Sequence, residues 1–512
     1  MQIKSSDKIA IIDGHKKISY SQLVEKIYYW IKIANISRGT NIALVADPSF
    51  DWLGVFLATL KRRAKINPID PYLKATKLAS YINHSSADTL VISKDYFEKV
   101  KKRLKGNPFL RNVILIEKKQ PLHTPLPETA TYRPEGYIPS VRLNTSGTTG
   151  SENGVLLSKA NLLSNIHNIR KRNLINGEDR VLVYLPYYHA FGLITALGTL
   201  MLNATLILSN PKTEENFEQL IKTTKPTLIA SVPLFFHTLN TKIVSKLTSS
   251  QNLVFKILRK IRIPFLSKLI FKKVHQMMGG TIRYMVSGGA ELSKEVETNF
   301  RGWGFNLISG YGLTEASPIV AASLNSPIGS VGKPFDDTDV KIVDNEVLVK
   351  GPGVMTKYIN PHKTNNTIVN GWLHTGDLGY VKRGYLYIIG RKKDLLVFHD
   401  GKKVHASVIE NKIMKLSNLI RECSIIQKDN KIQIAIIPNL KNFKEKELDK
   451  IEEFLWKEVM DKYNDKVNSY NKITKILLFQ AFPRTALNKV KKHLLKEEIS
   501  LNAKSQRDSS NI

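Results

Sequence analysis

The chain has 512 residues, which is too long for one compact core and predicts at least two domains. Hydrophobic residues make up 42% and charged residues 24%, as in ordinary globular proteins, and a single cysteine, Cys423, excludes an internal disulfide. The formal net charge of +33 is spread along the chain, and the aromatic residues are not interleaved with basic ones as in a nucleic-acid module. We therefore expect anionic partners such as phosphates, coenzymes, acidic carriers or lipid headgroups, and no nucleic acid.

Two segments bear on membranes and localisation. The first residues lack the apolar run of a signal peptide, so a cytoplasmic protein is expected. Segment 190–208 is largely apolar, but its threonines and a turn at 201–205 favour a buried helix followed by a buried strand. Segment 253–274 carries seven Lys or Arg and no acidic residue. It indicates either peripheral contact with an anionic bilayer or, as the favoured reading, a packed helix pair with a solvated basic face.

Short runs rich in β-branched residues alternate with helix-like periods along most of the chain. An amphipathic helix is expected around residues 23–31, and the clearest strands are 89–93, 113–116, 181–184, 205–208 and 283–287. Such alternation predicts an α/β fold, with parallel-type sheets flanked by helices in a large N-terminal domain. Ligands of such sheets gather at the carboxyl ends of the strands.

A domain boundary is predicted at residues 390–394. A strand at 384–389 closes the first domain, which we expect to span residues 1–389. New strands at 432–437 and 473–478 belong to a small α+β domain of residues 395–501. Residues 502–512 form a polar tail.

The most informative motif is Leu143-Asn-Thr-Ser-Gly-Thr-Thr-Gly150. It gathers two glycines and four hydroxyl side chains in eight residues. Glycine allows backbone amides to approach an oxyanion closely, and hydroxyl groups add short donors, so the motif predicts a loop that binds phosphates. By itself such a run is more often a polar surface turn.

Five more motifs follow, and the six in this order resemble the adenylate-forming superfamily of acyl-CoA synthetases, luciferases and peptide-synthetase adenylation domains. The resemblance extends from Ala10 to Lys489, and six motifs in family order make it specific. The motifs are Thr145-Ser-Gly-Thr-Thr-Gly150, Leu185-Pro-Tyr-Tyr-His-Ala-Phe-Gly192, Ser309-Gly-Tyr-Gly-Leu-Thr-Glu315, Gly371-Trp-Leu-His-Thr-Gly-Asp377, Gly390-Arg-Lys-Lys-Asp394 and Pro483-Arg-Thr-Ala-Leu-Asn-Lys489.

The resemblance implies that a carboxylate attacks the α-phosphate of ATP, expels pyrophosphate and becomes an acyl-adenylate. Tyr311 would offer a flat face to the adenine, and Thr314 would donate to the α-phosphate. Glu315 would bind Mg²⁺, which prefers carboxylate and phosphate oxygens, although a helix-capping role is the structural alternative. The other ATP-binding positions implied by the early motifs are Thr145, Ser146, Gly147, Thr148, Thr149, Gly150, Gly289, Ala290 and Gly312.

The later motifs imply the remaining contacts. Asp377 would accept the ribose hydroxyls, although a plain turn role is also open. Arg391 would add a ribose or phosphate contact. Asp394 occupies the family's hinge position, about which a mobile C-terminal lid swings between two states. Lys489 would bridge the substrate carboxylate and the α-phosphate; without the motif it would be one more surface charge.

The acid and the acceptor are also inferred from resemblance. Residues 269–280 and 282–293 are similar to the stretch typical of bacterial long-chain acyl-CoA synthetases and of their relatives that ligate to acyl carrier protein. These relatives imply an apolar acyl pocket lined by His189, Phe191, Gly288 and Gly310, although core packing of His189 and Phe191 is an open alternative.

Three departures from the family pattern bear on function. Glu152-Asn153 stands where the family usually has Pro-Lys, which removes a cation from the phosphate loop. Asn488 replaces the glycine before the lysine, a mild change. Residues 406–408 depart in a block that helps to form the thiol tunnel. The leading hypothesis is a fatty acid ligase with ATP and coenzyme A as substrates. Ligation to holo-acyl carrier protein is the close alternative, and a non-catalytic nucleotide-binding protein is a remote one.

Overall fold

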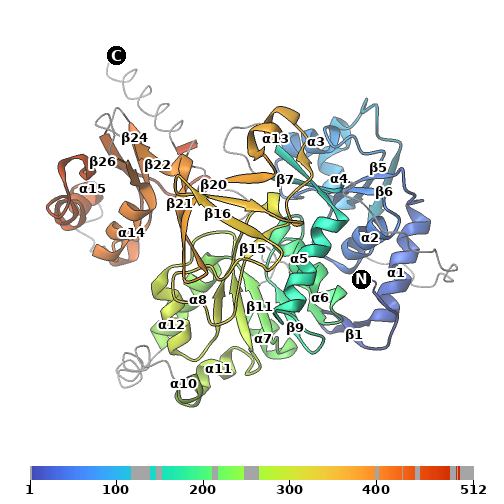
Figure 1. The fold of residues 1–512 in the computed structure, drawn as a ribbon, viewed down its shortest axis with the longest axis horizontal. Coiled ribbons are helices and arrows are strands. Elements are labelled where there is room, and N and C mark those ends of the chain that lie inside the picture. The colour runs from blue at the N-terminus through green and yellow to red at the C-terminus, as the bar shows by residue number, and fades with distance from the viewer. Residues whose placement is uncertain are drawn as a thin grey trace.

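The computed structural model describes residues 3–116, 139–145, 153–209, 217–246, 264–397, 403–428, 431–443, 450–484, 490, 492 and 494–495. A large part, built from the N-terminal three quarters of the chain, lies beside a smaller C-terminal part (Figure 1). This arrangement confirms the α/β architecture expected from the sequence.

The first large sheet is mostly parallel and has seven strands. Only the β1–β2 hairpin at its edge is antiparallel. Its order is β13 (Leu307–Ser309), β12 (Tyr284–Ser287), β11 (Leu228–Ser231), β9 (Arg180–Val183), β10 (Thr205–Ile207), β1 (Ile9–Asp13) and β2 (Lys16–Ser19).

The second seven-stranded sheet is mixed. Its central strands run parallel, whereas β8 pairs antiparallel with both β7 and β18. Its order is β18 (Lys357–Tyr358), β8 (Asn153–Ser158), β7 (Pro139–Thr145), β4 (Lys65–Pro68), β3 (Asn41–Val45), β5 (Thr89–Ser93) and β6 (Asn112–Ile116).

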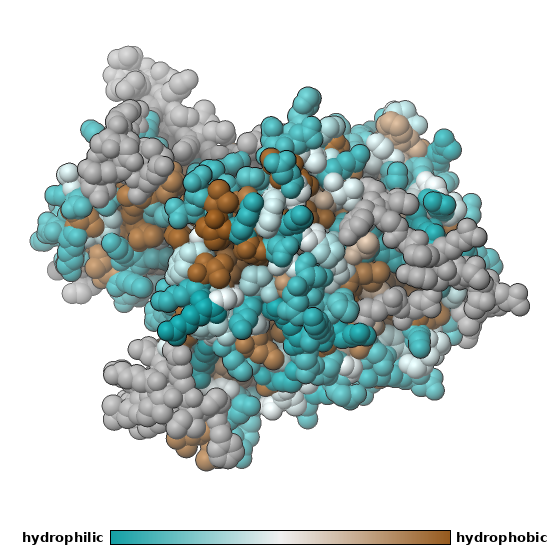
Figure 2. Space-filling view, viewed as in Figure 1, coloured by the Kyte–Doolittle hydropathy of each residue, from teal (hydrophilic) through white to brown (hydrophobic). Residues whose placement is uncertain are grey.

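The third sheet has five strands and is antiparallel, which the sequence alternation did not predict. Its strands are β16 (Asp339–Val343), β17 (Glu346–Lys350), β20 (Trp372–Lys382), β19 (Ile368–Val369) and β21 (Tyr385–Arg391). Hydrophobic residues gather near this sheet on the face shown in Figure 2. Val343 and Val381 are each 44% exposed. Beside this sheet, the short strands β14 (Tyr311–Gly312) and β15 (Ile319–Ala321) form a separate antiparallel pair.

Helices cover both large sheets. They begin at local signals: Ser19 caps α1 by accepting from the Gln22 amide, and the Gln22 side chain accepts from the Ser19 amide. The helices of the large part are α1 (Tyr20–Ile33), α2 (Phe50–Lys61), α3 (Ala75–Asn83), α4 (Lys94–Val100), α5 (Lys159–Lys171), α6 (Ala190–Met201), α7 (Phe217–Thr224), α8 (Pro233–Lys246), α10 (Pro264–Ile270), α11 (Lys272–Met277), α12 (Lys294–Gly302) and α13 (Pro361–Thr367). The buried helix and strand predicted in segment 190–208 are α6 and β10, which confirms that reading.

The smaller part contains its own core. A three-stranded sheet is formed by β24 (Ile420–Lys428), β25 (Lys431–Pro438) and β26 (Ile473–Leu478), and a hairpin by β22 (Leu395–Val397) and β23 (Lys403–His405). The helices α14 (Ala406–Leu416), α15 (Ile451–Leu455) and α16 (Asp461–Asn464) complete it. Cys423 lies on β24, where burial raises the pKa of its thiol, in keeping with a packing role.

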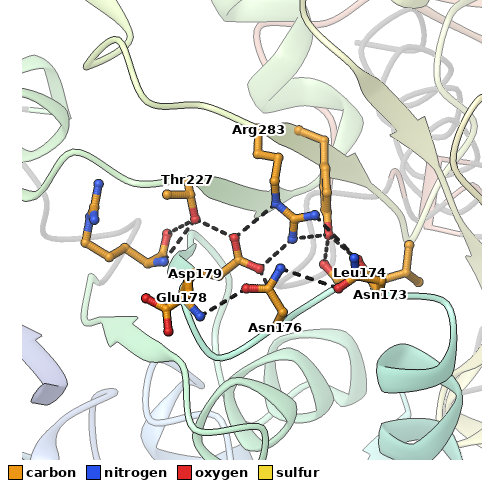
Figure 3. Close-up of polar contacts among 9 residues, drawn as sticks. Asn173, Leu174, Asn176, Glu178, Asp179, Thr227 and Arg283 are labelled. Carbon is orange, nitrogen blue, oxygen red and sulfur yellow. Dashed lines mark hydrogen bonds and ion pairs between the residues drawn. The ribbon is translucent and has the colours of Figure 1, made fainter. Parts of the chain in front are cut away.

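A polar network joins the amino ends of the parallel strands in the first sheet (Figure 3). Asp179, 2% exposed, precedes β9, and its carboxylate accepts from Thr227, which precedes β11, at 2.7 Å. Arg283, which precedes β12, donates to both carboxylate oxygens, at 3.2 and 2.5 Å. The hydroxyl of Tyr284 donates to the carbonyl of Asn173 at 2.9 Å. The network therefore fixes the edge of the sheet at which these parallel strands begin.

Candidate functional site

The candidate site lies at the carboxyl edge of the first sheet. Strands β9, β11, β12 and β13 run parallel as neighbours, so the residues that follow them meet at one edge. Gly288 follows β12 and Gly310 follows β13, and the Gly310 amide donates to the Ser287 carbonyl at 2.8 Å. The two glycine-containing motifs are therefore adjacent, although residues 288 and 310 are separated by two elements in the chain.

The residues implied for the acyl pocket meet at the same edge. A Cβ atom added to Gly288 would lie 3.1 Å from Cε1 of Phe191, so the ring lies against this glycine. His189 is the N-cap residue of α6, just before Phe191, and its ring contacts that of Tyr188 with centroids 4.8 Å apart. The structure thus brings Phe191, Gly288 and Gly310 together. Of the neighbouring positions, Gly289 has φ +83°, a left-handed conformation that favours glycine, and Ala290 is exposed.

Tyr311, Asp377 and Arg391 form a connected group. The hydroxyl of Tyr311 donates to Oδ2 of Asp377 at 2.8 Å, and Nε of Arg391 lies 2.9 Å from Oδ1. Asp377 and Arg391 are cross-strand partners on β20 and β21, which explains their contact. Asp377 is 4% exposed, whereas the Arg391 side chain is 56% exposed. An antiparallel pair thus presents one carboxylate and one cation to the tyrosine.

The electrostatics of this group follow from burial and charge. Burial raises the pKa of the Tyr311 hydroxyl well above its ordinary value, and the nearby Asp377 carboxylate raises it further. Burial lowers the pKa of Arg391, but Asp377 and the other neighbouring anions raise it overall. The tyrosine therefore stays a neutral donor and the arginine a cation at physiological pH.

The turn after Tyr311 holds Thr314 and Glu315 in a one-turn 3₁₀ helix, Thr314–Ala316. Gly312 is required there because an added Cβ would lie 1.8 Å from the carbonyl oxygen of Pro318. The Asn165 side chain on α5 clamps the turn: it accepts from the Ile319 amide at 2.8 Å and donates to the Ala316 carbonyl at 3.3 Å.

Glu315 has a partner that the sequence motifs did not predict. The hydroxyl of Tyr358 donates to Oε1 of Glu315 at 2.6 Å, and the Met355 amide donates to the Glu315 carbonyl at 2.7 Å. Burial raises the pKa of Tyr358, and the Glu315 carboxylate raises it further. Tyr358 belongs to β18, a two-residue strand whose position is set by pairing with β8, so no local sequence signal points to it.

The strands that flank the predicted phosphate loop lead to this group. Thr145 at the end of β7 pairs with Asn153 at the start of β8, and Val155 on β8 pairs with Tyr358. Ser146, Gly147, Thr148, Thr149 and Gly150 lie outside the described residues, as does Glu152. The two ends of the predicted phosphate loop, Thr145 and Asn153, are therefore cross-strand partners. Strand β8, which starts at Asn153, also pairs with β18, which holds Tyr358.

The predicted boundary segment begins inside a strand. β21 continues to Arg391, two residues beyond the expected end of that strand, and Asp394 ends a short 3₁₀ turn, Lys392–Asp394. Leu395 then starts β22, which pairs with β23. Asp394 is exposed, and its charge acts on Arg391 of the group around Tyr311.

Lys489 lies outside the described residues, but its motif neighbours are placed. Arg484 and Val490 are bridge partners on the smaller part. Arg484 also forms an ion pair with Glu422 of β24, and Val490 packs against the hydrophobic cluster that contains Phe482. Arg484 in the motif and Val490 just after it are thus anchored to the smaller part.

Comparisons with known proteins give the family. A sequence model of the AMP-binding enzyme family matches residues 2–359, and a model of the AMP-binding enzyme C-terminal domain matches residues 393–501. The long-chain-fatty-acid–CoA ligase FadD15 of Mycobacterium bovis is 28% identical over 418 residues, which cover 74% of this chain and 69% of the relative. The chloroplastic long-chain-fatty-acid–[acyl-carrier-protein] ligase AEE15 of Arabidopsis thaliana is 25% identical over 549 residues, covering 85% and 75%.

Solved structures share the fold over nearly the whole chain. The ATP-bound chimera RpMatB-BxBclM B1 has a TM-score of 0.79 at 22% identity and covers 97% of each chain. A fatty acyl CoA synthetase of Mycobacterium tuberculosis has a TM-score of 0.67 at 19% identity, covering 97% of this chain and 96% of its own. Because the family model spans well over half of the chain and the candidate site is built from that family's motifs, this chain belongs to the AMP-binding enzyme family.

Proposed function

We propose that this protein is an ATP-dependent ligase that activates a medium- or long-chain fatty acid and transfers the acyl group to the thiol of coenzyme A. The observation that carries the proposal is the contact of Asp377 with both Tyr311 and Arg391, next to the turn that holds Glu315. Relatives over most of the chain are named fatty acid ligases. In the first step a carboxylate oxygen bonds to the α-phosphorus as the bond to pyrophosphate breaks; in the second, the thiol sulfur attacks the acyl carbon and AMP leaves.

The nucleotide would lie along the Tyr311 group. We assign the adenine to the Tyr311 ring, the ribose hydroxyls to Asp377, and a ribose or phosphate contact to Arg391. Asp377 already accepts from Tyr311 on one oxygen and faces Arg391 on the other, so its carboxyl group is fixed in place and can accept further hydroxyl donors. Thr314 would donate to the α-phosphate, while the backbone at Gly289, Ala290 and Gly312 and the loop from Thr145 to Gly150 would complete the ATP site.

Glu315 is our candidate ligand for Mg²⁺. The chemistry of the donor fits, since Mg²⁺ prefers oxygen and binds through one or two carboxylates plus substrate phosphates. Tyr358 holds Oε1 at 2.6 Å, and within the described ranges no hydrogen bond is made to Oε2. A bound Mg²⁺ would neutralise charge on the phosphates. The described ranges contain no cluster of three His, Cys, Asp or Glu side chains placed to hold a metal.

The smaller part would act as a mobile lid. We propose an N-terminal domain of residues 1–389, a hinge at 390–394 centred on Asp394, and a lid at 395–501. In one state the lid would bring Lys489 to the α-phosphate, where its cation stabilises charge that develops during displacement. In the other it would admit the thiol. The anchoring of Arg484 and Val490 on the smaller part supports this assignment.

The acyl chain would enter an apolar pocket beside the first sheet. Phe191 against Gly288 supplies an apolar wall next to Gly310, and His189 lies at the start of the same helix. Pyrophosphate release with a series of fatty acids of increasing length tests the proposal. Release with one range of chain lengths is expected; no release with any acid would leave a non-catalytic nucleotide-binding protein, the alternative that the Glu152-Asn153 exchange motivates.

The acceptor has a second candidate, the phosphopantetheine thiol of an acyl carrier protein. One relative with this activity in its name aligns over 85% of this chain, and the charge of +33 would attract an acidic carrier. Thioester formation should be compared with coenzyme A and with a holo-acyl carrier protein at equal concentration. Product with the carrier alone would replace coenzyme A as the acceptor.

We also propose peripheral contact with anionic lipid through segment 253–274. In its described part, α10 exposes Leu266 (38%) and Leu269 (64%) beside Lys268, while Phe271 is buried in a core. Within the described ranges no helix has the length and apolar character needed to cross a bilayer. Sedimentation with phosphatidylglycerol vesicles tests this contact, and Leu269→Glu should weaken it if the segment is the contact site. A cytoplasmic location remains our expectation.

A further inference from the structure

Glu346 is a buried carboxylate beside the candidate nucleotide site. It is the first residue of β17 and follows a two-residue hairpin turn in which Asp344 (φ +50°) and Asn345 (φ +63°) are both left-handed. Aspartate and asparagine tolerate this conformation better than most residues, so the turn fixes where β17 begins. Glu346 is 7% exposed. A nearly buried anion needs partners, and those of Glu346 come from two different segments.

The two oxygens of Glu346 hold two segments of the site. Oε1 accepts from the amide of Gly376, at 3.0 Å, in the bulge of β20 just before Asp377. Oε2 accepts from Nζ of Lys392, at 3.1 Å, in the proposed hinge. Nδ1 of His374 lies 3.7 Å from the same Oε2. One carboxylate thus joins the bulge that places Asp377 to the segment about which the lid would move.

The β20 bulge before Asp377 depends on such support. Gly376 has φ +70° and no cross-strand partner in the registers of β20, so its amide is held by the carboxylate. The hydroxyl of Thr375 donates to the carbonyl of Val347 at 2.7 Å and accepts from the Asp377 amide at 3.0 Å. The direction of the Asp377 side chain is therefore set by the contacts of Thr375 and Gly376 with β17.

Lys392 keeps Glu346 in its ionised form. Burial by itself raises the pKa of Glu346, but the hydrogen bond from Lys392 and the one from the Gly376 amide lower it overall. The Lys392 side chain is 63% exposed, so it can leave without opening the core. If it left, the buried carboxylate would keep only the Gly376 amide and His374 at 3.7 Å as partners. Such an arrangement is costly and would favour a shift of the carboxylate and of the β20 bulge.

We propose that Glu346 is a positioning residue that couples the hinge to the nucleotide site, by holding Lys392 with one oxygen and the β20 bulge before Asp377 with the other. The inference rests on the proposed function, because it needs Asp377 to contact the nucleotide and residues 390–394 to bend. Coupling is reciprocal: a nucleotide on Asp377 stabilises the Lys392 contact, and release of Lys392 weakens the hold on the nucleotide. Rotation of the hinge would then change the affinity of the site for the bound nucleotide.

The test measures the dissociation constant for AMP by titration calorimetry in the full-length chain. The variants are Glu346→Gln, which keeps the shape and removes the charge, Lys392→Gln, and the double variant. Lys382→Gln on β20 is the control, since it removes an exposed lysine from the same sheet. Thermal melting of each variant checks that it folds, and Lys392→Gln changes a mainly exposed side chain.

Each single variant should raise the dissociation constant about fivefold to tenfold, in the range of the net contribution of a typical hydrogen bond. The double variant should raise it no further than the larger single change, because both remove one contact. The control should stay within about twofold. The coupling would be overturned if either single variant bound AMP as tightly as the wild type. It would also be overturned if the effects of the two substitutions multiplied in the double variant. Pyrophosphate release with fatty acids is measured separately. Failure of the proposed function, seen as no pyrophosphate release, can thus be distinguished from failure of the coupling, seen as unchanged AMP binding in the variants.

Discussion

The network around Asp179 should contribute to stability without contributing to nucleotide binding. Asp179→Ala removes a buried carboxylate that accepts from Thr227 at 2.7 Å, from the Asn176 amide at 2.9 Å and from Arg283 at 2.5 Å (Figure 3). Breaking a buried pair in this way costs about 3–5 kcal/mol. Water can reach Arg283, which is 34% exposed, so we expect a smaller loss of about 2–3 kcal/mol in the free energy of unfolding.

Urea unfolding followed by tryptophan fluorescence measures this loss. The chain has more than one core, so the comparison uses the midpoint of the transition of the large part. Glu178→Ala is the matched control: it is adjacent in sequence and its side chain is 95% exposed, so it should change stability by less than about 0.5 kcal/mol. Affinity for AMP should stay within about twofold in both variants, because the network lies at the amino edge of the sheet.

A double-mutant cycle with Arg283→Ala isolates the pair. We expect a coupling energy of about 1–2 kcal/mol between Asp179 and Arg283, since they make two hydrogen bonds. Equal stability of Asp179→Ala and Glu178→Ala would refute the reasoning, as would additive effects in the cycle.

Three further predictions concern the reaction and its surroundings. Lys489→Ala should lower adenylate formation about a hundredfold or more yet spare thioester synthesis from added acyl-adenylate; equal loss of both half-reactions would contradict a two-state lid. Phe191→Ala should shift the preferred acid in pyrophosphate release toward longer chains, whereas Gly288→Ala, whose Cβ would lie 3.1 Å from the ring, should shift it toward shorter ones. Hydrogen bonds from Lys171 and Arg172 lower the pKa of Asp336 to about 2, so Asp336→Asn should destabilise at neutral pH, and its difference from wild type in thermal melts should vanish as pH falls from about 4 to 2.

Much of the fold could be predicted from the sequence because its signals are local. The strand at 89–93 and the helix and strand in segment 190–208 were predicted from local runs and periods of apolar residues. Sequence motifs predicted the candidate site because their residue types and order are specific to one family. These motifs lie at 145–150, 309–315, 371–377, 390–394 and 483–489. The adjacency of Gly288 and Gly310 agrees with the expectation that ligand sites gather at the carboxyl ends of parallel strands, although the strand before Gly310 was not predicted.

Other features are visible only in the tertiary structure, because they depend on pairing between segments that are distant in the sequence. The antiparallel third sheet, the contact of Tyr358 with Glu315, and the two-way hold of Glu346 could not be read from local patterns. Tyr358 is placed by a two-residue strand that pairs with β8. Glu346 is placed by a hairpin turn and by the register between β17 and β20. Sequence by itself identified the residues that we expect to carry the chemistry; the register of the strands determined which of them touch, because a one-residue slip would turn each side chain to the opposite face.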